Sequence, residues 1–71
     1  MEKDIITSYW NRVDEATKTL GVTLKFMSEI TGIDYAAIRL WRFKKRMPNA
    51  EALSKISEFL NLSLDYLIKG K

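Results

Sequence analysis

The fold is decided by residues 23–41, TLKFMSEITGIDYAAIRLW. Thr23 carries a short side-chain oxygen of the kind that caps a helix, just before a run with apolar residues at helical spacing. Gly32 falls where that run must end, because glycine adopts the left-handed conformation that closes a helix without a steric penalty. Ile33 can then seal the turn, and Asp34 supplies an oxygen and a negative charge that favour the start of a second helix. The stretch therefore predicts two short helices joined by a sharp turn.

Three further helices are predicted around this pair. Residues 4–20 carry apolar side chains at the three-and-four spacing of a helix with one buried face. Asn49 can cap another helix after Pro48, and Ser63 can cap a last short one after a stop at Asn61. We find no strand pattern and no linker, so we predict an all-α protein with a single domain over residues 1–71. Its five helices are expected at residues 4–20, 23–31, 34–44, 49–60 and 63–69.

The apolar positions of these helices predict one small core. On the first helix the buried stripe is expected to run from Ile6 to Leu20, and on the third helix Ile38 and Trp41 should face the same way. A domain of this size has a core of only a few large side chains. The predicted core comprises Trp10, Leu20, Met27, Ile38, Trp41, Leu53, Ile56, Leu60 and Leu67.

Composition excludes several classes of function. The chain has no cysteine and no histidine, which removes thiolate and imidazole metal ligands and the commonest general base. It also has no glycine-rich phosphate loop and no convincing pair of acids, so we expect neither an enzyme nor a cofactor or metal site. No apolar run is long enough to cross a bilayer, and the first four residues are too acidic for a signal peptide. We therefore expect a soluble cytoplasmic protein.

Positive charge is concentrated in one part of the chain. Residues 1–34 hold four basic and six acidic side chains, whereas residues 35–71 hold eight basic and three acidic ones. Five of the basic residues lie between Arg39 and Arg46, with no acid among them. A focused cationic patch of this kind suits a polyanion such as DNA, although a solvated basic loop is the simpler alternative.

The helix pair about Gly32 also has two interpretations. It can be a plain helical hairpin or a helix-turn-helix unit, whose second helix enters the DNA major groove.

The joint spacing of these features resembles the lambda-repressor-like, Cro/C1-type (XRE) helix-turn-helix family. The similarity runs through TLKFMSEITGIDYAAIRLW, then KKRMPN, then ALSKISEFLNLSLDYLI, and spans residues 20–68, with the motif at about residues 23–44. The positions that match the family pattern or closely substitute for it are Met27, Ser28, Gly32, Ile33, Asp34, Ile38, Trp41, Pro48, Leu53, Ile56, Leu60, Ser63 and Leu67.

The resemblance implies a DNA-binding site on the third helix, with the second helix supporting it. Arg39 is the strongest candidate for reading a base, because its planar fork matches the two acceptors on a guanine edge, but it can equally contact phosphate. Tyr35 can donate to a phosphate or pack against the supporting helix. The residues implied to contact DNA are Leu24, Tyr35, Ala36, Arg39, Leu40, Arg42, Lys44, Lys45 and Arg46.

Several positions depart from the family pattern. Leu24, Ala36 and Leu40 stand where relatives often carry hydrogen-bonding side chains, and Lys44 replaces a common glycine. Arg42 stands where many relatives have a glutamate that pairs with an arginine on the first helix, and Thr17 occupies the place of that arginine. The usual ion pair between these two helices is therefore expected to be missing.

Two functions compete. The first is a sequence-specific transcriptional regulator of phage or bacterial type, a repressor for example, which binds double-stranded DNA as a homodimer at a two-fold symmetric operator. The second is a protein-binding antirepressor or modulator, which would use the helix-turn-helix face to bind a partner repressor. Charge favours the first. The second is favoured by a predicted apolar patch on that face, unless Phe43 folds back under the basic residues and Leu40 borders the core. The predicted patch consists of Leu24, Ala36, Leu40 and Phe43.

Overall fold

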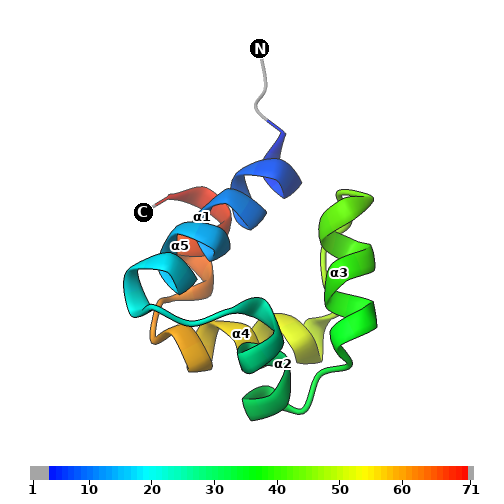
Figure 1. The fold of residues 1–71 in the computed structure, drawn as a ribbon. Coiled ribbons are helices and arrows are strands. Elements are labelled where there is room, and N and C mark those ends of the chain that lie inside the picture. Colours follow the sequence, from blue (N-terminus) through cyan, green and yellow to red (C-terminus); the bar gives the residue numbers. More distant parts are fainter. Residues whose placement is uncertain (1–3, 71) are drawn as a thin grey trace.

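The computed structural model describes residues 4–70 and is all-helical over that range (Figure 1). The five helices are α1 (Ile5–Leu20), α2 (Leu24–Thr31), α3 (Tyr35–Phe43), α4 (Ala50–Leu60) and α5 (Leu64–Lys69). Each predicted helix is present, and the bounds differ by one residue or so, because the predicted ranges include the capping residues.

Side-chain caps and left-handed residues set most of the helix ends. The side-chain oxygens of Thr23, Asn49 and Ser63 accept hydrogen bonds from backbone N–H groups in the first turns of α2, α4 and α5. Gly32 closes α2 with φ 77°, as the turn in the helix pair requires. Asp34 precedes α3 as predicted, but the expected cap is wrong in detail, because its side chain makes no capping hydrogen bond.

The core lies where α1, α2, α4 and α5 meet, and it agrees with most of the predicted residues. Trp10, Met27, Ile38, Ile56, Leu60 and Leu67 are buried. Trp41 and Leu53 are half-buried and pack against that cluster. The prediction for Leu20 is wrong: it is the last residue of α1, is 53% exposed, and lines an open hollow beside Leu60 and Leu62 that leaves it only partly covered. Tyr9, which the predicted core omits, is fully buried, as is Val13 one turn further along α1.

The helix packing leaves α3 at one side of the molecule. α1 packs against α5, α2 packs against α4, and α4 also contacts both α1 and α5. The nearest neighbour of α3 is α2, to which the Gly32 turn joins it, and Figure 1 shows α3 standing at the right-hand edge with one flank open. Within residues 4–70 we find no helix that is both long and apolar enough to cross a membrane.

Candidate nucleic-acid interface

The two sides of α3 have opposite character. Ile38 is fully buried and Trp41 half-buried, so these residues fix which side of α3 meets the core. Ala36, Arg39 and Leu40 face away from it and are exposed. The helix thus presents a free flank, as insertion into a groove requires.

Most of the predicted site residues line one open groove. This groove has a volume of about 460 Å³ and lies between the start of α2 and the length of α3. It is lined by Leu24, Tyr35, Ala36, Arg39, Leu40, Arg42 and Phe43. The structure thus brings together six of the nine residues implied to contact DNA, whereas Lys44, Lys45 and Arg46 follow the end of α3.

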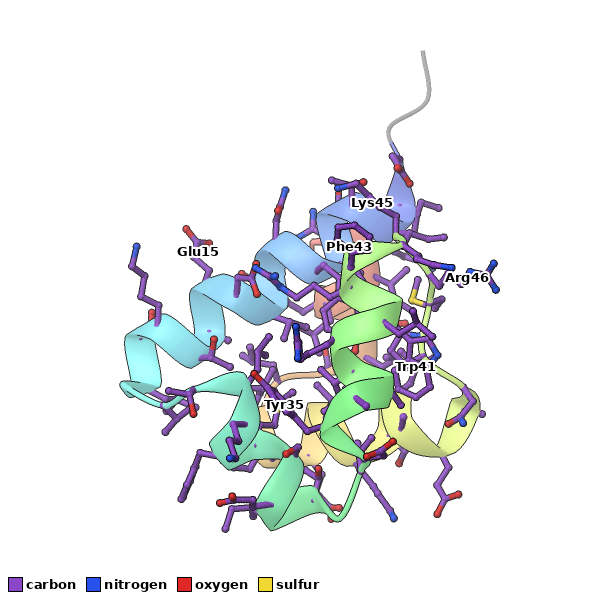
Figure 2. The ribbon with its side chains drawn as sticks, turned by 45° about the vertical axis from the view of Figure 1, so that its right-hand side comes forward. Glu15, Tyr35, Trp41, Phe43, Lys45 and Arg46 are labelled. Atoms are coloured by element: carbon purple, nitrogen blue, oxygen red, sulfur yellow. The ribbon has the colours of Figure 1, made fainter. Side chains whose placement is uncertain are left out.

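Arg39 and Tyr35 lie against each other within the groove. They are one helical turn apart, and the guanidinium carbon of Arg39 sits 5.7 Å from the centroid of the Tyr35 ring. A cation over an aromatic face is attracted by the ring quadrupole, which limits the directions that the side chain samples. Figure 2 shows Tyr35 and Trp41 on different flanks of α3; Trp41 packs against the core, whereas Arg39 is exposed.

Arg42 forms an ion pair with Asp14 of α1, which the sequence did not indicate, since the prediction concerned only the usual pair with residue 17. Its Nε donates to one carboxylate oxygen at 3.0 Å and its Nη2 to the other at 2.7 Å. The charges are exchanged relative to the usual pair of the family: here the acid is on α1 and the base is on α3. Thr17, at the position of the usual arginine, instead donates its hydroxyl to the backbone carbonyl of Asp14. The hydrogen bonds to Asp14 also raise the pKa of Arg42.

We define the basic segment as Lys44, Lys45 and Arg46, which follow α3. All three side chains are exposed. The turn to the segment is closed by Lys45, whose φ of 57° is left-handed, and not by Lys44, which stands at the position of the family glycine but has φ −87°. The backbone N–H of Arg46 then donates to the carbonyl of Trp41 at 2.7 Å. Three cations are therefore held on an ordered turn next to the exposed flank of α3.

The sequence did not indicate that α1 takes part in this site. The indole Nε1 of Trp10 donates to the backbone carbonyl of Arg46 at 2.9 Å, next to the Asp14–Arg42 pair. The sequence predicts Trp10 only as a core residue and does not single out Asp14. Their spacing of four residues on a helix was the one available signal, since it places both on the same side of α1.

The apolar patch predicted on α3 is present in part. Leu40 is 49% exposed and Phe43 82% exposed, so neither joins the core, and the alternative in which Phe43 folds back is wrong. Leu24 is half-buried and packs against the core, which makes it a rim residue of the patch. The sequence also did not single out Phe26 and Ile30 of α2, which are 44% and 59% exposed.

Comparison with known proteins places this geometry in a family. A family model described as helix-turn-helix matches residues 15–67, which covers α2 to α4 entirely, with the last part of α1 and the first part of α5. No curated protein and no solved structure matched the chain significantly. The matched region contains the helix pair about Gly32, the exposed flank of α3 and the basic segment. The chain therefore belongs to the lambda-repressor-like (XRE) helix-turn-helix family of DNA-binding regulators.

Proposed function

We propose that this protein is a sequence-specific transcriptional regulator of the phage or bacterial type, acting in the cytoplasm. The observation that carries the proposal is the exposed flank of α3, which is continuous with the basic segment. Residues 35–50 contain five basic side chains and no acidic one, and Asp14 of α1 pairs with Arg42 alone, so Arg39 and the basic segment keep a positive field at this face. In this proposal α3 lies in the major groove and α2 supports it against the sugar–phosphate backbone.

In this proposal some exposed residues contact the bases of DNA and others contact its phosphates. Arg39 lies in the middle of the free flank and can donate two hydrogen bonds to one guanine edge. Ala36 and Leu40 offer apolar contact to thymine methyl groups. Lys44 and Arg46 follow the end of α3 with exposed side chains, which suits phosphate contacts.

The proposed binding unit is a homodimer. A helix-turn-helix protein that binds as a dimer places its two recognition helices about one DNA turn apart, roughly 34–36 Å, on a two-fold symmetric operator. The described residues extend over 37 × 23 × 20 Å, so two copies side by side can span that distance.

A titration with duplex DNA tests the proposal. The protein is mixed with a randomised duplex pool at low and at physiological salt, and the bound duplexes are sequenced after repeated selection. We expect affinity to fall steeply with salt, because each phosphate contact releases counterions, and we expect an enriched sequence with two-fold symmetry. An absence of binding to any duplex at low salt would reject the proposal.

A second candidate function is supported by Leu40 and Phe43. Their exposure on the helix-turn-helix face gives an apolar patch that DNA covers poorly, whereas a protein can bury it. In this candidate the protein is an antirepressor or modulator that docks on a partner repressor. Tight binding to a repressor of the same family without binding to duplex DNA would favour it. Leu40→Asp should then abolish that binding and leave the helix content and the melting temperature unchanged.

A further inference from the structure

The Asp14–Arg42 pair joins the outer end of α3 to the body of the protein. α3 is held at its first turn by the Gly32 turn and by packing against α2. Its last turn carries Arg42, whose guanidinium donates hydrogen bonds to both carboxylate oxygens of Asp14 on α1. Two parallel hydrogen bonds fix the direction of the guanidinium as well as its distance, which a single ionic contact does not.

The position of that end matters for reading bases. A nine-residue helix is about 13 Å long, so a tilt of roughly 10° about its first turn moves its last residue by about 2 Å. Hydrogen bonds to base edges tolerate only a few tenths of an ångström. Side chains that read bases therefore depend on neighbours that hold their helix in place.

A second contact reinforces the same connection. Trp10 lies one turn before Asp14 on α1 and bonds through its indole N–H to the carbonyl of Arg46. A narrow space of about 150 Å³ between α1 and the end of α3 is lined by Thr7, Trp10, Asn11, Asp14, Arg42 and Lys45. One side of α1 thus contacts both the last turn of α3 and the basic segment.

We propose that Asp14, acting through Arg42, positions the C-terminal end of α3 for sequence recognition. Asp14 does not contact DNA in this proposal, and it contributes to the choice of base sequence more than to the stability of the fold. The pair is partly exposed, with 45% of the Arg42 side chain and 37% of the Asp14 side chain accessible, and such pairs contribute little to folding. This inference rests on the DNA binding proposed above.

Charge reversal separates positioning from simple electrostatics. Asp14→Arg adds positive charge, so by electrostatics alone it should tighten binding to every duplex. If Asp14 positions α3, the same change repels Arg42 and lowers selectivity, which is the ratio of affinities for the duplex selected by the wild-type protein and for a random duplex. Glu15→Arg is the matched control, because it adds the same charge on the next residue of α1. Glu15 is exposed and extends away from α3 (Figure 2).

We expect Asp14→Arg and Arg42→Asp each to lower selectivity between about three- and thirtyfold, which lies within the range of couplings between contacting residues. The double variant Asp14→Arg/Arg42→Asp keeps the net charge and restores an opposite-sign pair, so its selectivity should return to within about threefold of wild type. Arg42→Lys keeps the charge but loses the two-pronged geometry, and should give an intermediate loss with an unchanged salt dependence. Circular dichroism should give similar melting temperatures for all these variants.

The inference would be overturned if Asp14→Arg behaved like Glu15→Arg and raised affinity for both duplexes alike. It would also be overturned if the double variant were no more selective than Arg42→Asp, since Arg42 would then act on DNA directly. In both outcomes the wild-type protein still discriminates between duplexes. A wild-type protein that did not discriminate would instead reject the proposed function, and the positioning role with it.

Discussion

The indole N–H of Trp10 donates a hydrogen bond to the backbone carbonyl of Arg46, with 2.9 Å between Nε1 and the oxygen. Trp10 is only 4% exposed, and its ring meets that of Tyr9 edge-on with 5.2 Å between centroids. A core side chain of α1 is therefore bonded directly to the segment that carries the exposed cations. This bond couples folding of the core to placement of the basic segment.

Trp10→Phe should lower the free energy of unfolding by about 1–3 kcal/mol, because it leaves the Arg46 carbonyl without its donor. Trp41→Phe is the control, since Trp41 is half-buried and its loss of volume should cost less. Urea denaturation measures both. In the wild-type protein, NMR should find the Trp10 indole proton exchanging more slowly than that of Trp41. Equal exchange rates would contradict the hydrogen bond.

Tyr9→Phe should leave stability unchanged or raise it by up to about 1 kcal/mol. The hydroxyl of Tyr9 is buried and finds no hydrogen-bond partner in residues 4–70, and a buried polar group without a partner is unfavourable. The same burial raises the pKa of Tyr9, because the charged form is poorly solvated there. Thermal melting of the two proteins is sufficient as a measurement. A loss of more than about 1 kcal/mol would mean that the hydroxyl has a partner in solution.

Lys45→Gly should stabilise the fold by roughly 1 kcal/mol, because Lys45 has a left-handed φ of 57° that costs a residue with a Cβ about that much. Asn61→Gly is the matched control: Asn61 has the same φ, but asparagine tolerates this conformation better and the gain should be smaller. Lys45→Ala removes the same charge and keeps the strain. Equal melting temperatures for Lys45→Gly and Lys45→Ala would show that the turn relaxes without cost.

The helix ends and most of the core were predictable because they depend on local chemistry. Thr23, Asn49 and Ser63 cap helices because of their own side-chain oxygens, and Gly32 ends α2 because of its own conformational freedom. Leu20 was misplaced because helical spacing gives the side of a helix but not how far the neighbouring helices extend along it.

Only the part of the candidate site that lies on a single helix could be predicted from the sequence. The exposed flank of α3 follows from the burial of Ile38 on the other side, which the spacing already indicated. The contacts of Asp14 with Arg42 and of Trp10 with Arg46 join residues 28 and 36 positions apart. Such contacts depend on the angle at which α1 crosses α3, and a local sequence pattern does not predict that angle.

Arg39 and Lys44 should differ in how they affect DNA binding. Arg39→Ala should cost about 1–3 kcal/mol on the selected duplex and relax the preference at one base position, because a bidentate base contact is lost. Lys44→Ala should weaken binding to selected and random duplexes alike. It should also reduce the slope of log affinity against log salt concentration by about one, because one phosphate contact is lost. Quantitative titration at several salt concentrations measures both effects. If Arg39→Ala changed both duplexes equally, Arg39 would be a phosphate contact.

The last prediction concerns Phe43, the most exposed large apolar side chain of the described residues. At 82% exposure it contributes little to the core, so Phe43→Ser should change the free energy of unfolding by no more than about 0.5 kcal/mol. The matched control is Phe59→Ser: Phe59 of α4 packs against the core and lies 6.3 Å from the ring of Phe26, so its loss should cost about 2 kcal/mol or more.

The same variant separates the two candidate functions. Phosphates and base edges give Phe43 little to bind, so under the DNA-binding proposal Phe43→Ser should keep its affinity for the selected duplex within about twofold. Under the protein-binding alternative, the exposed ring is a natural anchor in the centre of an interface, and its loss should weaken binding to a partner repressor by at least about tenfold. Isothermal titration against the duplex and against the repressor measures both affinities. A tenfold loss on DNA with an unchanged melting temperature would place Phe43 in the DNA interface and contradict the division of roles proposed for α3.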